Sequence, residues 1–330
     1  MEELRQFLPI PHRLACSDNY TCLISEDGKL STWGCNESTP DVESERSMLP
    51  KLIDLADPVR YVACSDTTTG VITYDGRLST WGDITSNFSL PQAITMVSFG
   101  DFHMLVLTVD GSVYSYGRGE NGVLGTGDLS DRDTLTLVKL PIACRTVKSD
   151  FSTSYAIMVD GSVYHWGNVY DFVGNGVQTN SLLPAKVALS ELVLDISCGT
   201  CYVTLLTVEG DVYIYGDNEI HTGGTGRLNL PSQCKAISSS SWHNLALLEN
   251  GELWGWSYSN MNWVLGVDED VIDSSTPTLI PLDCSVLVMG LGVVHSIILS
   301  REGVMYGCGY GTNGCLGNGK KHCGRFTRGV

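Results

Sequence analysis

The stretch VDGSVYSYG at residues 109–117 decides the fold, because variants of it recur along the whole chain. Each copy has an acidic or amide residue before a glycine, an apolar residue two positions later, and an aromatic residue near its end. The seven copies are EDGKLSTWG (26–34), YDGRLSTWG (74–82), VDGSVYSYG (109–117), VDGSVYHWG (159–167), VEGDVYIYG (208–216), ENGELWGWS (249–257) and REGVMYGCG (301–309). A motif that recurs at intervals of tens of residues along a chain indicates a repeat architecture.

Each copy predicts a β-hairpin, because Asp-Gly, Glu-Gly and Asn-Gly provide the positive φ of a tight turn. An apolar run such as MLVLTV (104–109) precedes the turn and an alternating segment follows it. A further strand is expected before each unit, led by Pro in LPIAC (140–144), LPSQC (230–234) and IPLDC (280–284). The chain therefore predicts an all-β, seven-bladed β-propeller of four-stranded blades, with turn glycines at 28, 76, 111, 161, 210, 251 and 303.

The two ends of the chain suggest how the ring closes. FLPIPHRLACSD (7–18) resembles KLPIACRTVKSD (139–150), and no Pro-led strand follows the last unit. We therefore expect residues 4–14 to supply the missing strand of the seventh blade, with residues 320–330 as a tail. On this interpretation residues 1–330 form a single propeller domain, a monomeric ring.

Two units carry longer signatures, FGDFHMLVLTVDGSVYSYGRGENGVLGTGD (99–128) and GLGVVHSIILSREGVMYGCGYGTNGCLGNG (290–319). They resemble the repeats of the regulator of chromosome condensation, and the resemblance extends over residues 4–319. It implies a propeller that binds other proteins, and the best-known member of the family is a guanine-nucleotide exchange factor. The copies here are degenerate: the second unit has only the short loop DITSNFSL (83–90), and no wedge insertion is found in the third or fourth unit.

The segments GRGENG (117–122) and GYGTNG (309–314) match the dinucleotide pattern G-x-G-x-x-G. That pattern binds a pyrophosphate only between a strand and a helix. No amphipathic helix follows either segment, so both are interpreted as inter-strand loops and no cofactor is expected.

The twelve cysteines and the repeated histidines are residue types that can bind metal ions. Without a secretory leader the cysteines are expected to be free thiols in recurring packing positions. The histidines His103, His243 and His295 fall in different repeats and are expected to hydrogen-bond to backbone. A zinc site at Cys308, Cys315, His322 and Cys323 is a weak alternative because the spacing matches no standard pattern. No metal site is predicted.

The net charge of the chain limits the kinds of molecule that it can bind. Asp and Glu number 37 against 20 Lys and Arg, a net charge of −17, which disfavours nucleic acid and anionic membranes. The longest uncharged run, residues 284–300, predicts two buried strands rather than a membrane span. The N-terminus has no signal-peptide pattern, so we expect an intracellular protein, cytoplasmic or nuclear.

Candidate partner-binding residues lie in acidic loops, where propellers commonly bind other proteins. The loops are DVESER (41–46), DLSDRD (128–133) and DEDVID (268–273). Six of the seven tryptophans lie close to repeat positions and are expected in blade packing, whereas Trp263 does not. The predicted partner-binding residues are Asp128, Asp131, Asp133, Trp263, Asp268, Glu269 and Asp270.

Three classes of function fit this pattern. The first is a non-catalytic protein-interaction scaffold, since no Ser-His-Asp set, catalytic carboxylate pair or P-loop is present. The second, implied by the resemblance, is a guanine-nucleotide exchange factor for a small GTPase. The third, an inhibitor or a light-sensing propeller, is least favoured because the tryptophans fall in packing positions and no Gly-Trp-Arg-His-Thr repeat is found.

Overall fold

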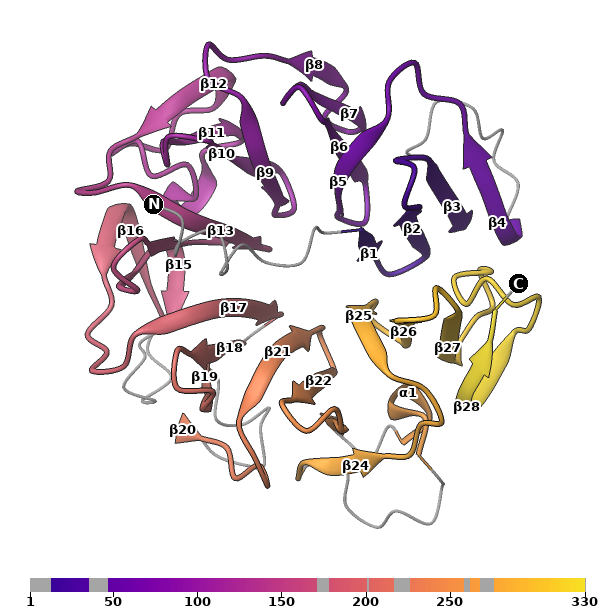
Figure 1. The fold of residues 1–330 in the computed structure, drawn as a ribbon. Coiled ribbons are helices and arrows are strands. Elements are labelled where there is room, and N and C mark those ends of the chain that lie inside the picture. The colour runs from indigo at the N-terminus through magenta and orange to yellow at the C-terminus, as the bar shows by residue number, and fades with distance from the viewer. Residues whose placement is uncertain are drawn as a thin grey trace.

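Seven antiparallel sheets of four strands each surround a central axis in the computed structural model (Figure 1). The structure describes residues 13–35, 47–170, 178–200, 202–216, 226–257, 262–267 and 276–329. Within every blade the strands follow chain order from the axis outward. The first three blades are β1 Leu14–Cys16, β2 Tyr20–Ile24, β3 Leu30–Gly34 and β4 Ser47–Ile53; β5 Val59–Cys64, β6 Thr68–Thr73, β7 Leu78–Gly82 and β8 Ser86–Phe88; and β9 Ile94–Phe99, β10 His103–Thr108, β11 Val113–Gly117 and β12 Arg132–Val138.

The remaining four blades repeat this order. They are β13 Cys144–Asp150, β14 Thr153–Met158, β15 Val163–Tyr170 and β16 Gln178–Lys186; β17 Val193–Gly199, β18 Tyr202–Thr207, β19 Val212–Gly216 and β20 Gly226–Arg227; β21 Cys234–Ser239, β22 His243–Leu248, β23 Leu253–Ser257 and β24 Thr278–Ile280; and β25 Val286–Leu291, β26 His295–Ser300, β27 Met305–Tyr310 and β28 His322–Arg328. Two short helical turns, η2 Glu120–Gly122 and α1 Asn262–Leu265, lie in loops between third and fourth strands. In the described part of the chain no helix is long and apolar enough to cross a bilayer.

The apolar runs before the turns form the second strand of each blade. All six residues are buried in each of β6, β10, β14, β18, β22 and β26, because neighbouring blades cover both faces. The seven predicted turn glycines all have φ between 76° and 89°. The hairpin prediction is therefore confirmed in every repeat.

The Pro-led segments are not strands, contrary to the prediction. Residues 140–143 and 230–233 form bends that enter the next blade, and the inner strand begins at the following cysteine, Cys144 or Cys234. Proline cannot donate a ladder hydrogen bond, which suits it to a link between sheets. The fourth strand instead precedes the proline, as β12 does.

The ring closes differently from the prediction. The fourth strand of the last blade is β28, formed by the segment expected to be a tail, and it pairs with β27 at Gly309–Cys323 and Gly307–Thr327. Leu14 lies in β1 of the first blade, and residues 4–12 are outside the described residues. The sequence signal of β28 is weak because Cys323 is its only buried residue.

Loop contacts rather than a shared strand join the last blade to the first, and the Gly319 N–H donates to the Met48 carbonyl at 3.2 Å. The Trp33 indole Nε1 of the first blade donates to the Cys315 carbonyl of the last blade at 2.7 Å. Trp166 makes the equivalent bond to the Val123 carbonyl, also 2.7 Å, between the third and fourth blades. The closing interface thus repeats an ordinary inter-blade interface.

The glycine-rich loops make this contact possible, as expected for inter-strand loops. Gly317 (φ 63°) lies against the Trp33 ring, where an added Cβ would come within 2.7 Å of Nε1. Gly125 (φ 67°) has the same relation to Trp166, at 2.8 Å. Neither position can carry a side chain without displacing the indole.

Candidate functional site

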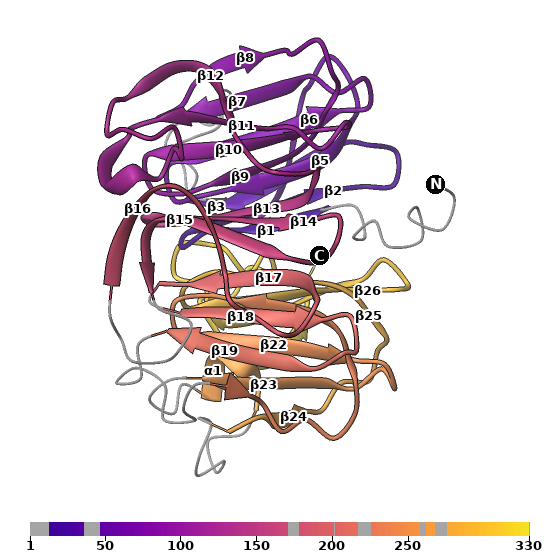
Figure 2. The same ribbon diagram turned by 90° about the vertical axis from the view of Figure 1, so that its left-hand side faces the viewer.

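The axial mouth is a pocket at the end of the axis where each inner strand turns into the second strand. Every blade contributes one loop to it. The lining is residues 16–18, 64–66, 99–101, 149–151, 198–200, 240–241 and 291–293. In Figure 2, a view across the axis, most strands run from this face to the opposite one.

Four aspartates line the mouth on the first four blades: Asp18, Asp66, Asp101 and Asp150, here called the acidic quartet. The Asp18 backbone N–H donates to Asp66 Oδ1 at 3.1 Å, across two blades. Burial, followed by the neighbouring Asp66 carboxylate, raises the pKa of Asp18. Burial is also the main cause that raises the pKa of Asp150 to about 7, and it raises that of Asp101. The mouth therefore gathers carboxyl groups whose ionisation is opposed by burial.

Exposed aromatic side chains lie on the loops of the mouth. Phe102 and Phe151 are 46% and 47% exposed, and Trp242 on the sixth blade is 37% exposed. The Arg118 guanidinium lies 4.4 Å from the centre of the Phe102 ring, a cation–π contact. The prediction that Trp242 is a packing residue is wrong, because the side chain lies at the tip of a loop beside the mouth.

The thiols at the mouth are not suited to nucleophilic chemistry. Cys16, Cys64 and Cys198 occupy equivalent positions of their repeats, as predicted. Burial raises the pKa of Cys16 and Cys198, and a hydrogen bond with Cys22 together with burial raises that of Cys64. A thiol must ionise to react, so these groups are packing residues.

The ring nitrogens of two repeated histidines bridge neighbouring blades. His103 Nε2 lies 3.0 Å from Ser154 Oγ and His243 Nε2 lies 2.8 Å from Ser296 Oγ, each on the next blade. The predicted backbone partners are therefore wrong for these nitrogens. Within the described residues, no group of three or more His, Cys, Asp or Glu is placed to hold a metal ion.

The comparison with known families agrees with this geometry. The family model described as Regulator of chromosome condensation (RCC1) repeat matches residues 12–38, 94–123 and 234–262, which fall in the first, third and sixth blades. The chain carries RCC1 repeats within a seven-bladed β-propeller.

Curated relatives of the RCC1-repeat propeller are distant. The chain is 28% identical over 250 residues to the Ultraviolet-B receptor UVR8 of Arabidopsis thaliana, covering 69% of this chain and 56% of the relative. It is 24% identical over 269 residues to the human Regulator of chromosome condensation, covering 70% of this chain and 63% of the relative. The chain thus spans less than two thirds of these relatives.

Solved structures share the fold. Human WBSCR16 superposes with a TM-score of 0.75 at 17% identity, covering 90% of each chain. Prp20p of Saccharomyces cerevisiae, whose structure is reported with its binding properties to Gsp1p and histones, gives 0.71 at 21% identity, covering 88% of this chain and 83% of that one.

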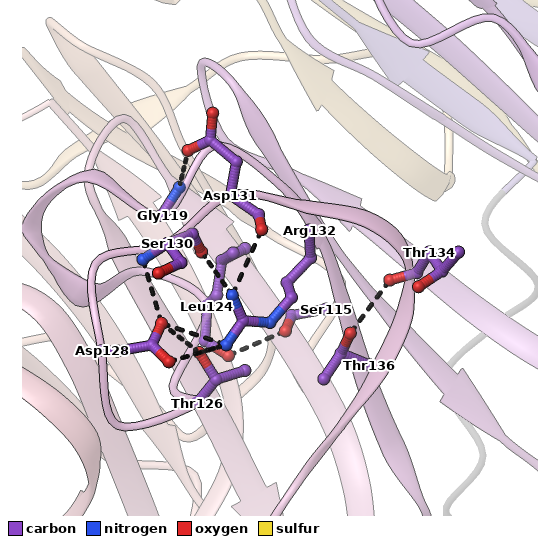
Figure 3. Close-up of polar contacts among 10 residues, drawn as sticks. All are labelled: Ser115, Gly119, Leu124, Thr126, Asp128, Ser130, Asp131, Arg132, Thr134 and Thr136. Carbon is purple, nitrogen blue, oxygen red and sulfur yellow. Dashed lines mark hydrogen bonds and ion pairs between the residues drawn. The ribbon is translucent and has the colours of Figure 1, made fainter.

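The predicted acidic loop of the third blade is organised by internal bonds (Figure 3). Arg132 binds both carboxylate oxygens of Asp128, at 2.8 and 3.0 Å, and Asp131 Oδ1 accepts the Gly119 N–H at 2.9 Å. Hydrogen bonding from the Ser130 N–H, and then from Arg132, lowers the pKa of Asp128. Asp133 is exposed on β12. Two of the three predicted aspartates in this loop therefore shape the loop.

Trp263 also has neighbours within the RCC1-repeat propeller. The Trp263 ring packs edge-on against the Tyr310 ring with their centres 4.7 Å apart, and its centre lies 6.3 Å from that of the His322 ring. These two contacts join α1 to the last blade. His322 is exposed while Cys308, Cys315 and Cys323 are buried, so the alternative zinc set is not brought together. The predicted residues Asp268, Glu269 and Asp270, and the loop 41–46, are outside the described residues.

Sequence reasoning missed the acidic quartet, although a signal exists. Ser-Asp or Gly-Asp recurs at 17–18, 65–66, 100–101 and 149–150, at the end of four successive inner strands. A repeated aspartate outside the turn marks a shared surface, because equivalent positions of a propeller meet at the axis.

Proposed function

We propose that this chain is a non-catalytic scaffold that binds a basic or mixed-charge protein partner at the axial mouth. The observation that supports the proposal is the acidic quartet, together with the exposed rings of Phe102, Phe151 and Trp242 on the loops of the same mouth. Complementary charge speeds and orients association, and exposed aromatic residues provide the anchors of protein interfaces.

The quartet is unfavourable for the folded chain alone. Burial and then the neighbouring Asp66 carboxylate raise the pKa of Asp18, and burial raises that of Asp150 to about 7. A cationic side chain inserted into the mouth would reverse this cost, since an opposite charge favours the ionised carboxylates. Residues retained at the expense of stability are typical of binding sites.

We also propose an intracellular location, in the cytoplasm or nucleus. The support is the state of the cysteines: the eleven in the described part of the chain are all free thiols. Reducing compartments maintain that state.

The triple variant D18N/D66N/D101N tests the mouth. We expect recovery of the partner in quantitative affinity capture to fall at least about tenfold, because three charges that attract the partner are removed. The fold should persist, since the substitutions relieve repulsion. The matched control is E26Q/E249Q/D283N, which removes three exposed charges from the opposite face and should retain the partner. Equal recovery with both variants would exclude the mouth as the binding site.

A second candidate function is guanine-nucleotide exchange on a small GTPase. The similarity to the human Regulator of chromosome condensation and to Prp20p favours it, because the best-known member of the family has this activity. Exchange would need no catalytic group from the propeller, only contacts that favour the nucleotide-free GTPase.

Stimulated release of labelled GDP from a panel of small GTPases separates the two candidates. If the chain is an exchange factor, release from one GTPase should accelerate at least about tenfold, and D18N/D66N/D101N should reduce the acceleration. No acceleration across the panel, together with a partner retained at the mouth, would leave the scaffold function alone.

A further inference from the structure

The face opposite the axial mouth, here called the turn face, exposes apolar side chains. It consists of the turns between second and third strands and the links that enter the next blade. In four successive blades the residue before the acidic-Gly pair is apolar and exposed: Tyr74 63%, Val109 68%, Val159 50% and Val208 49%. Single exposed apolar residues are ordinary, but a contiguous set marks an interaction site.

The links connect these residues into one surface. Ile142 and Leu192, 43% and 52% exposed, lie in the links that enter the fourth and fifth blades. The Val159 N–H donates to the Ala143 carbonyl at 3.1 Å, and the Val208 N–H donates to the Leu192 carbonyl at 3.0 Å. These two bonds lie within a blade, and a second set joins each turn to the link of the next blade. The carbonyls of Gly76, Gly111 and Gly161 accept the N–H groups of Ile94, Cys144 and Val193 at 3.0, 2.9 and 2.9 Å. The turns and links of blades two to five therefore form one row, and the apolar arc is the set of its exposed apolar residues: Tyr74, Val109, Ile142, Val159, Leu192 and Val208.

The other three blades differ at the same turn position. They carry Glu26, Glu249 and Arg301, all exposed. Tight-turn geometry is the same in all seven blades, so it does not require an apolar residue here. The arc is a property of blades two to five.

Carboxylates accompany the arc. Asp75, Asp110, Asp160 and Glu209 directly follow the apolar turn residues and are exposed. Hydrogen bonds from Thr108 and Ser162 lower the pKa of Asp110 and Asp160, so both are ionised. Within the described residues Asp110, Asp160 and Glu209 form no ion pair.

We propose that the apolar arc docks a second protein partner, a segment that presents apolar side chains together with Lys or Arg. The apolar residues match the arc, and the basic residues match the adjacent carboxylates. A second copy of this chain would place like carboxylates against each other, and the net charge of −17 also opposes self-association.

This surface is separate from the axial mouth. The mouth lies where inner strands end, and the arc lies at the other end of the same strands (Figure 2). The propeller can therefore hold two partners at once, which goes beyond the function proposed above.

The test uses the full chain and a labelled 14-residue amphipathic peptide made only of Leu and Lys, with fluorescence anisotropy as the measurement. We expect the peptide to bind, and the variant V109S/V159S/V208S to weaken binding at least about tenfold because it removes apolar contact without changing charge. A Lys-Ser peptide should bind the two proteins equally, which separates the arc from charge attraction at the mouth.

The control E26S/E249S/R301S introduces serine at the equivalent turns of the other blades. It removes exposed charges rather than apolar area and should leave binding of the Leu-Lys peptide within about twofold. Equal loss in both variants, or no loss in the valine variant, would overturn the proposal. Sedimentation velocity gives a further criterion: a wild-type dimer abolished by V109S/V159S/V208S would assign the arc to a second copy instead.

Discussion

Replacing Trp33 with alanine should lower the free energy of unfolding by about 3–5 kcal/mol, the usual cost of truncating a buried tryptophan. The side chain is 1% exposed and packs in the interface that closes the ring. W33F should cost about 1–2 kcal/mol, since it mainly loses the bond from Nε1 to the Cys315 carbonyl. Urea unfolding followed by fluorescence and by circular dichroism measures both.

W254A is the matched control. Trp254 is a half-buried tryptophan whose Nε1 donates to Glu252 on the same blade at 3.1 Å, so it does not contribute to ring closure. If W33A destabilises the protein no more than W254A, the indole does not hold the first and last blades together.

The second large effect concerns pH. Burial lowers the pKa of His103 and His295 to about 4 and that of His243 to about 3. Below pH 6.5 the unfolded chain binds protons that these folded histidines cannot, so stability is lost as the pH falls from 7 toward 4. At pH 5 the loss is about 2 kcal/mol for each histidine. In H243Q, the loss of stability between pH 7.5 and 5 should shrink by about that amount, as urea unfolding at the two values would show.

Asp150 should act in the opposite direction. Its pKa in the folded state is about 7, above the ordinary aspartate value, so the folded chain binds the extra proton and gains stability as the pH falls from 7 toward 4. D150N should therefore stabilise the protein at pH 8 by about 1–2 kcal/mol and make its acid sensitivity steeper. If H243Q and D150N change the slope in the same direction, burial does not set these pKa values.

The repeat pattern predicts the blades because one local rule, an acidic or amide residue followed by glycine, fixes the same turn seven times. The turn glycine has φ of 81° at Gly28 and 76° at Gly303, at opposite ends of the chain. Closure is not predictable in this way, since β28 is exposed along most of its length and lacks an apolar pattern.

The candidate surfaces depend on which equivalent positions meet in space. Asp18 and Asp150 are 132 positions apart in sequence and line one pocket. Conversely, the sequence suggests that the Asp128 carboxylate is free to bind a partner, yet Arg132 forms an ion pair with it. Charge runs in a sequence do not reveal which charges are already paired.

Closure without a shared strand has a consequence for the connectivity of the ring. Because every described strand pairs only within its own blade, no blade is structurally first or last. A gene encoding such a ring can start at any link between blades without altering a hydrogen-bond ladder. The order of the blades along the chain is therefore not what holds the ring closed.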